Sequence, residues 1–529
     1  MAIPDPKSSL TTYAVSVFIS SVVFYAIYLI LLHPLHEYPG PFLAKLTDWY
    51  AGSHAFGKTL HLMIHKNHVK YGSVVRLAPN RLVFNTVTAL HDIYKNDRVS
   101  KSYTYRPKGA RITDNIFNAQ DKTVHRGKRR MVGAALSERT TKSLEPLVMR
   151  QVDVYLARLL ETAQASEPVN LTKRARRLAL DIIGNVSFGY HLETQTKEEN
   201  RFVANAIAFG LYRSNILHHV YYLSRPLLHR ITDTLIFHFR EKYWRLLEKM
   251  IESRVARGKE GDRDFYSFIS ESSAEEGNIR QGELFSEATV LMAAGSDTTA
   301  TALSATFFYL SRNPKRYEKL CNEIRTAFAS GRDIKTGPQL AGCRYLRACL
   351  DEGMRMSPPV PGALWRMQDP GDEQPLVIDG HVVPKGTLMG VSIYAIHHNE
   401  EYFPDSFAFK PERWLAAGTS SSEEEAAAKR MHDAFAAFST GSRSCAGKPL
   451  AYMESSLVLA KTLWYFDFES APGKLGEVGG GNPDGPPGRS RLDEYQLGDI
   501  FTASHDGPYL MFRPRGEHWR DFGGASQIG

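Results

Sequence analysis

The sequence predicts a mainly α-helical protein: a single helical domain with small β-sheets, preceded by one N-terminal transmembrane helix. Three observations predict this class. Leu10 to Leu32 is an uncharged, mostly apolar stretch, and one helical pattern of apolar residues continues from about Leu284 to Ser311. Short apolar runs at 74–77 and 82–84, separated by a Pro-Asn pair, predict a β-hairpin. The long helix would measure about 42 Å, enough to cross a whole domain.

The composition is that of a large globular protein in a reducing compartment. Its 529 residues are 43% hydrophobic and 11% aromatic, which allows a large buried core. The four cysteines form no C-x-x-C pair, so neither a zinc site nor a disulfide framework is expected. The net charge of +8 suits attraction to anionic lipid or to an acidic partner, and no nucleic-acid-binding motif accompanies it.

The N-terminal segment, residues 1–33, is expected to be a permanent membrane anchor. A helix from Leu10 to Leu32 would be roughly 34 Å long, enough to span a bilayer with some tilt. The alternative is a cleaved signal peptide, whose apolar region is usually only about 7–15 residues long. His33 and Pro34 follow directly, without a small-residue cleavage site. We therefore favour the anchor, whose orientation the sparse flanking charges do not set.

Residues 34–48 are expected to form a proline-rich hinge, and residues 49–529 one folded domain. The run YPGP, residues 38–41, is too rich in proline and glycine to continue a helix. The acidic, alanine-rich residues 420–429 and the Gly/Pro-rich residues 473–488 are expected to be exposed loops. Neither loop separates two plausible cores, so a single domain is predicted.

The long helical pattern contains a local irregularity. The run AGSDTT, residues 294–299, places a glycine and two threonines in mid-helix, where glycine costs about 1 kcal/mol relative to alanine. Such a break indicates either a functional position or a threonine cluster that bends the helix by bonding to its own carbonyls.

The most informative run is FSTGSRSCAG, residues 438–447. A lone cysteine in a Gly/Ser-rich turn is usually a buried thiol. Here a phenylalanine, two glycines, an arginine and the cysteine stand at the spacing F-x-x-G-x-R-x-C-x-G. The run resembles the haem-binding loop of the cytochrome P450 family at all of its fixed positions, a match that chance does not readily produce.

The resemblance implies a role for each fixed residue of this loop. Cys445 would be the axial thiolate ligand of the iron in haem b (iron protoporphyrin IX). Gly441 and Gly447 would allow a tight turn close to the porphyrin. Arg443 would pair with a haem propionate, and Phe438 would pack under the ring.

The AGSDTT run resembles the oxygen-activation motif of the same family, A-G-x-D/E-T. The resemblance implies O2 as a co-substrate, with small residues leaving space for it. The Thr298 hydroxyl would hydrogen-bond the bound oxygen, and Asp297 would relay protons from solvent. Asp297 and Thr298 are therefore the expected catalytic residues.

A structural network is implied by two further segments. Glu352 and Arg355 lie three residues apart on one predicted helix face, where such a pair is usually solvated and of small value. They resemble the E-x-x-R signature of the family, and Arg413 in the run PERW resembles the arginine that completes a buried Glu-Arg-Arg network. We expect these three residues to hold the haem pocket together rather than to take part in chemistry.

Further haem contacts are implied by the run HRGKRR, residues 125–130. It resembles the W-x-x-x-R segment of the family, with His125 in the tryptophan position and Arg129 in the arginine position. Both would donate hydrogen bonds to a propionate, and Arg366 in the run PGALWR is a third candidate. The other basic residues of 125–130 form either a landing patch for an acidic reductase or an ordinary solvated helix face.

The resemblance also implies where a substrate would bind. The stretches concerned are the residues after Lys101 and residues 209–222, 290–294, 360–364 and 500–502, which are mostly apolar and suit a hydrophobic molecule.

The resemblance covers nearly the whole chain and is closest to fungal microsomal enzymes, which often oxidise polyketides or terpenoids of secondary metabolism. It implies a monooxygenase that hydroxylates or epoxidises a hydrophobic small molecule, in the endoplasmic reticulum membrane with its catalytic domain facing the cytosol. NADPH-cytochrome P450 reductase would supply the electrons, with cytochrome b5 as a further donor, since no flavin or nicotinamide fingerprint is evident. Two alternatives remain: a reductase-independent haem-thiolate isomerase or dehydratase, and a non-catalytic haem-binding membrane protein.

Overall fold

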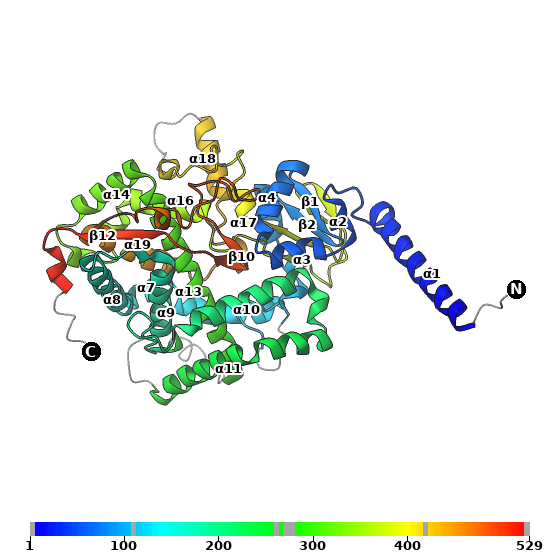
Figure 1. Cartoon of the computed structure of the whole chain (residues 1–529), viewed down its shortest axis with the longest axis horizontal. Coiled ribbons are helices and arrows are strands. Elements are labelled where there is room, and N and C mark those ends of the chain that lie inside the picture. The colour runs from blue at the N-terminus through cyan, green and yellow to red at the C-terminus, as the bar shows by residue number, and fades with distance from the viewer. Residues whose placement is uncertain (1–5, 107–112, 259–263, 268–280, 416–421, 523–529) are drawn as a thin grey trace.

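The computed structural model describes residues 6–106, 113–258, 264–267, 281–415 and 422–522. A body made mostly of helices carries small β-sheets, and the helix α1 (Pro6–Ile27) projects away from it (Figure 1). The mainly α-helical class predicted from the sequence is confirmed.

Helices make up most of the body. Besides α1 they are α2 (Phe42–Leu46), α3 (Trp49–Phe56), α4 (Leu60–Tyr71), α5 (Val87–Tyr94), α6 (Lys122–Ala135), α7 (Glu138–Ser143), α8 (Glu145–Gln164), α9 (Leu171–Phe188), α10 (Phe202–His219), α11 (Pro226–Ala256), α13 (Gln281–Ser311), α14 (Pro314–Ala327), α15 (Pro338–Ala341), α16 (Arg344–Met356), α17 (Ile393–His397), α18 (Ser422–Ala434), α19 (Lys448–Tyr465) and α20 (Lys474–Glu477). The segment η1 (Tyr28–Leu32) is a π-helix, and the 3-10 segments are η2 (Tyr103–Tyr105), η3 (Tyr221–Ser224), η4 (Gly331–Asp333), η5 (Pro411–Trp414), η6 (Gly441–Arg443) and η7 (His518–Phe522).

The strands form small sheets, of which the β10–β11 hairpin lies next to α13. The described strands are β1 (Val74–Ala78), β2 (Arg81–Phe84), β3 (Val99–Lys101), β4 (Val169–Asn170), β5 (Arg366–Gln368), β6 (Leu376–Ile378), β7 (His381–Val383), β8 (Leu388–Val391), β9 (Phe466–Ser470), β10 (Gly498–Ile500), β11 (Thr502–Ser504) and β12 (Tyr509–Pro514). A five-stranded sheet has the order β1-β2-β8-β5-β3, and a three-stranded sheet has the order β4-β12-β9. The predicted hairpin is β1 and β2, which pair antiparallel from Val74 opposite Phe84.

Helix α13 crosses the centre of the body, as its long apolar pattern predicted (Figure 1). It begins at Gln281, slightly before the expected Leu284, and ends at Ser311. Pro314 follows closely, and a proline disfavours the helical conformation of the residue before it. The helix contacts α9, α16 and α19, so that it positions residues from three parts of the chain around one centre.

The root of the N-terminal helix is fixed to the body. Leu10–Leu32 is the one described helix that is long and apolar enough to span a membrane, with mean hydropathy 2.5. The fully buried guanidinium of Arg76, in β1, donates hydrogen bonds to the carbonyl oxygens of Leu29 and Leu35 at 2.9 and 3.3 Å. Residues 34–48 then continue against β1 through α2. The stretch expected to be a hinge therefore lies in contact with the body.

The expectation of a loop at residues 420–429 was wrong. From Ser422 onward these residues belong to α18, and residues 420 and 421 lie outside the described part of the chain. Three glutamates occupy the first turn of α18, where negative charge favours a helix, and three alanines follow. The composition indicated exposure, but the high helix propensity of the same residues decides the structure.

Candidate active site

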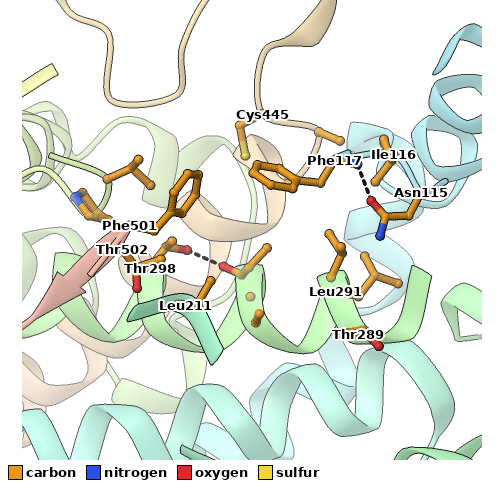
Figure 2. A pocket seen from close by; sticks show the side chains of 18 of the residues that line it. Asn115, Ile116, Phe117, Leu211, Thr289, Leu291, Thr298, Cys445, Phe501 and Thr502 are labelled. Carbon is orange, nitrogen blue, oxygen red and sulfur yellow. Dashed lines mark hydrogen bonds between the residues drawn. The ribbon is translucent and has the colours of Figure 1, made fainter. Parts of the chain in front are cut away.

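A cavity of about 820 Å³ lies between α13 and the loop that precedes α19. Figure 2 shows Cys445 on one side of this cavity and Thr298 of α13 on the other, with the rings of Phe117 and Phe501 between them in this view. Each of the five stretches expected to contact a substrate contributes to the walls. Lining residues from these stretches include Thr104, Leu211, Leu291, Val360 and Thr502.

The loop around Cys445 is held by its own backbone. The Cys445 N–H donates to the carbonyl oxygen of Phe438 at 2.8 Å, and the Ser444 N–H donates to that of Gly441 at 3.1 Å. Gly441 has a φ of 76°, and a Cβ atom there would lie 2.0 Å from the backbone oxygen of Tyr94 in α5. Glycine alone meets both conditions, so the position of the loop against α5 depends on residue 441.

The thiol of Cys445 is exposed to the cavity yet lies deep inside the protein. Gly447 is beside it, since a Cβ atom at this glycine would lie 3.9 Å from the sulfur. Burial raises the pKa of the Cys445 thiol, whereas the backbone at Gly447 and the charge of Arg129 act in the opposite direction. A metal cation at the sulfur would overcome the burial, because a coordinating thiol is deprotonated.

Basic side chains converge on the cavity wall next to this loop: Lys101, His125, Arg129, Arg366 and Arg443. Burial lowers the pKa of His125 to about 3, and the neighbouring cations add to the effect, Arg443 most. Burial also lowers the pKa of Lys101 well below its usual range, and the charges of Arg366 and Arg443 lower it further. This wall therefore favours an anionic group, and a pair of carboxylates would accept hydrogen bonds from its arginines.

Across the cavity, α13 presents a hydroxyl group. The Thr298 hydroxyl donates to the carbonyl oxygen of Ala294 at 2.6 Å, within its own helix. Asp297 is buried behind this face, with Oδ1 3.2 Å from Nε of Arg176 and Oδ2 accepting from the Thr502 hydroxyl at 3.3 Å. Burial raises the pKa of Asp297, and Arg176 opposes the rise. The expected catalytic pair thus faces two ways: Thr298 lines the cavity, and Asp297 points to the partly exposed Arg176.

The structure shows why a glycine occupies position 295, which the sequence did not reveal. A Cβ atom at this position would lie 2.6 Å from Cδ1 of Ile183 in α9. The glycine therefore allows α13 and α9 to pack closely, in addition to leaving space in the cavity. Ala294, which is exposed to the cavity, is the small residue that keeps this face of α13 open.

A buried ionic network is centred on the carboxylate of Glu352. It accepts hydrogen bonds from Nε and Nη2 of Arg355 at 2.8 and 3.0 Å and from Nε of Arg413 at 3.1 Å. Trp414 Nε1 also donates to it at 3.0 Å, a partner that the sequence motif did not indicate. Burial raises the pKa of Glu352, but Arg355 and Arg413 outweigh this effect and hold the pKa below its usual range. The three residues expected to form a network are brought together.

A second buried acid in the cavity wall was missed. Glu454 in α19 lines the cavity, and its side chain hydrogen-bonds Thr299 of α13. Burial raises the pKa of Glu454 to about 8, so its carboxyl group is mostly neutral at neutral pH. The available signal was an acid on an otherwise apolar helix face, between Met453 and Leu457.

Comparison with known proteins identifies the family. The family model of cytochrome P450 matches residues 39–477. The chain belongs to the cytochrome P450 family. It is similar to cytochrome P450 monooxygenase AKT7 of Alternaria alternata, at 34% identity over 92% of this chain and 94% of the relative. It is also similar to the monooxygenases poxM of Penicillium oxalicum (35%, over 95% and 94%) and apf7 of Gibberella fujikuroi (35%, over 95% and 97%).

The cavity fits the haem group that this P450 family binds. Cys445 offers a thiol on a backbone-held loop, and thiolate is the iron ligand of P450 enzymes. The basic wall beside it suits the two propionates of a porphyrin. The donor set and the electrostatics of the site therefore agree with haem, and the family uses O2 as co-substrate.

Proposed function

We propose that this P450 inserts one atom of O2 into an unactivated C–H or C=C bond of a hydrophobic small molecule. Electrons come from NADPH through a separate NADPH-cytochrome P450 reductase, with cytochrome b5 as a further donor. The observation that carries the proposal is the placement of Cys445 and Thr298 across one largely apolar cavity, with Asp297 behind Thr298. A haem-thiolate isomerase or dehydratase needs no such proton-delivering pair.

The residues of the chain divide into those that hold the haem and those that move protons. Haem bound through Cys445 supplies the oxidising chemistry, and its thiolate ligand favours O–O cleavage. We assign its propionates to His125, Arg129, Arg366 and Arg443, and the shape of the loop to Phe438, Gly441 and Gly447.

Proton delivery starts at the far side of α13. Asp297 takes up a proton on the Arg176 side, which its raised pKa favours, and releases it toward Thr298. The Thr298 hydroxyl, which donates to the carbonyl oxygen of Ala294, would instead donate to the oxygen atom that receives the proton.

The cavity and the N-terminal helix support the same biological setting. Apolar walls favour a substrate such as a polyketide or terpenoid, and the organisms of the similar enzymes support a role in fungal secondary metabolism. Residues 1–33 serve as a single-pass anchor in the endoplasmic reticulum, residues 34–48 as the connection, and residues 49–529 as the cytosolic catalytic domain.

The experiment begins with the natural substrate, which accumulates when the gene is deleted in its host and is identified by metabolite profiling. Thr298→Ala should retain haem and substrate binding and continue to consume NADPH, while product falls and hydrogen peroxide appears. Asp297→Asn should slow turnover itself, because the proton supply is interrupted.

Thr306→Ala is the matched control for this experiment. The Thr306 hydroxyl makes the same bond within α13, to Ala302 at 2.8 Å, but does not line the cavity. This variant should leave the ratio of product to NADPH unchanged. Product formation with neither NADPH nor reductase would overturn the monooxygenase proposal in favour of a rearrangement.

A further inference from the structure

A buried carboxylate lies behind the cavity wall, in the hairpin formed by β10 and β11. Asp499 in β10 is about 1% exposed. Its Oδ1 accepts from Nδ2 of Asn215 in α10 and from the backbone N–H of Phe501, both at 3.1 Å. Its Oδ2 accepts no hydrogen bond from any residue that the structure describes.

The two bonds to Oδ1 do not explain why an acid occupies this position. An asparagine would accept the same two hydrogen bonds and would avoid the cost of burying a carboxylate. Burial raises the pKa of Asp499 to about 7, and no charged side chain among the described residues compensates this burial. The two hydrogen bonds to Oδ1 and the nearby backbone of His61, in the first turn of α4, only moderate the rise. The second carboxylate oxygen, Oδ2, is therefore a buried hydrogen-bond acceptor without a donor among the described residues.

Asp499 lines a small chamber that adjoins the large cavity. The chamber has a volume of about 10 Å³, roughly the space of one water molecule or one hydroxyl group. His218, Val360 and Phe501 line both the chamber and the large cavity. The floor beside Oδ2 is Gly362, where a Cβ atom would approach to 3.3 Å. The chamber is thus a polar recess at the end of a mostly apolar site.

The ring of Phe501 stands between the two spaces. Phe501 has a φ of 91°, a backbone conformation that residues other than glycine rarely adopt. Its ring contacts those of Phe117 and His218, with centroids 5.4 and 5.6 Å away. Such unusual backbone conformations persist where the surroundings determine them, and here the Asp499 carboxylate bonds the N–H of the same residue.

We propose that Asp499 Oδ2 recognises a hydroxyl group on the end of the substrate that is remote from the site of oxidation, and that Phe501 closes this recess when no hydroxyl group occupies it. The inference rests on the proposed function for the existence of a substrate. It adds that the substrate is a hydrophobic molecule carrying an alcohol, because a buried acceptor without a partner discriminates strongly against ligands that have no donor.

The test measures binding of two matched molecules to the full-length, haem-loaded enzyme in lipid nanodiscs by calorimetry, without NADPH or reductase. The pH is set at about 8.5, above the pKa of Asp499, so that its carboxyl group is ionised and only accepts hydrogen bonds. Decan-1-ol donates a hydrogen bond, whereas its isomer 1-methoxynonane only accepts one. The wild type should bind the alcohol about tenfold more tightly than the ether. Asp499→Asn should abolish this preference, since its amide N–H₂ replaces Oδ2 while its oxygen keeps the bonds to Asn215 and Phe501. Comparing the alcohol-to-ether ratio between variants cancels the partitioning of both molecules into lipid.

Two further variants make the result decisive. Asp506→Asn removes the same charge from an exposed position of the neighbouring loop and should leave the preference unchanged. Phe501→Gly removes the ring, suits the positive φ, and should tighten alcohol binding with the preference retained. If Asp499→Asn fails to fold, Phe501→Gly decides alone.

Equal binding of alcohol and ether by the wild type, a preference that survives in Asp499→Asn, a preference that Phe501→Gly loses, or no saturable binding of decan-1-ol would each overturn the proposal. Because no turnover is involved, a preference found in an enzyme that forms no oxygenated product would contradict the proposed function and leave the hydroxyl site standing.

Discussion

Replacing Glu352 with glutamine should destabilise the protein more than removing any single hydrogen bond to that residue. The carboxylate is fully buried and accepts from Arg355, Arg413, Trp414 and the backbone N–H of Lys410. A glutamine keeps one acceptor oxygen, but its N–H₂ group would replace the other. Oε2 of Glu352 accepts from Arg355 Nε and Trp414 Nε1. In the glutamine variant, these two N–H donors would face the N–H₂ group, which is also a donor. The buried guanidinium group of Arg355 and the largely buried one of Arg413 would also lose their counter-charge.

The expected magnitude follows from this geometry. Removing one partner of a buried ionic network costs about 3–5 kcal/mol. Trp414→Phe is the graded reference, because it removes one hydrogen bond to a charged group, worth roughly 1.5–3 kcal/mol, and leaves all the charges paired. Since folded proteins are stable by only about 5–15 kcal/mol, Glu352→Gln should remove at least about a fifth of the stability, and Trp414→Phe less.

Urea unfolding at neutral pH, followed by circular dichroism and by haem absorbance, measures both variants against the wild type. The ranking should be wild type, Trp414→Phe, then Glu352→Gln, with haem content of the purified protein falling in the same order. If Glu352→Gln unfolds at the same urea concentration as Trp414→Phe, the uncompensated arginines are not the main cost and the reasoning fails.

Three further predictions follow from the site and the anchor. Cys445→Ser should lose the strongly red-shifted absorption band of the reduced, carbon-monoxide-bound enzyme together with activity; a variant that keeps the band has another ligand. Deleting residues 1–27 or 1–33 should release the protein from membranes in a sedimentation assay, and protein that stays on membranes would reveal a second membrane-binding surface. Only the longer deletion should lower the midpoint of thermal unfolding, because it removes the Leu29 carbonyl that accepts a hydrogen bond from Arg76. Burial raises the pKa of Glu454 from its usual 4.5 to about 8, so folding holds a proton that the unfolded chain releases, and wild-type stability should fall as pH rises through that window. Glu454→Gln should lack this fall and should be more stable than wild type above pH 8, by roughly 5 kcal/mol at most. Parallel pH profiles of the two proteins would contradict the assignment.

Much of the site was predictable from local sequence. The loop of residues 438–447 is short, and its backbone bonds and the positive φ of Gly441 are set within a few residues, so a spacing pattern contains them. The hairpin of β1 and β2 and the long helix α13 were predictable for the same reason. Each depends on periodicity or turn chemistry that a continuous stretch of chain carries.

The contacts between distant segments were not predictable in this way. The packing of Gly295 against Ile183 joins two helices more than a hundred residues apart in sequence, and the bond from Asn215 to Asp499 joins segments still farther apart. Trp414 entered the Glu352 network through an orientation that a run of four letters does not specify. Such contacts depend on how helices meet, which a single sequence does not display.

The hydrogen bonds from Arg76 to the carbonyl oxygens of Leu29 and Leu35 fix the end of the N-terminal helix to the body. The helix and the body should therefore change orientation together. A body joined to its helix by a flexible linker would adopt many orientations relative to a lipid surface, independently of the tilt of the helix. Because the end of the helix is fixed to the body, a change in the tilt of the helix should rotate the whole body. Hydrophobic thickness sets the tilt of a long apolar helix, so membranes of different thickness would present different rims of the enzyme to the lipid. In the proposed membrane-anchored enzyme, the thickness of the bilayer would thereby influence how a hydrophobic substrate enters, without any lipid contact to the residues of the cavity.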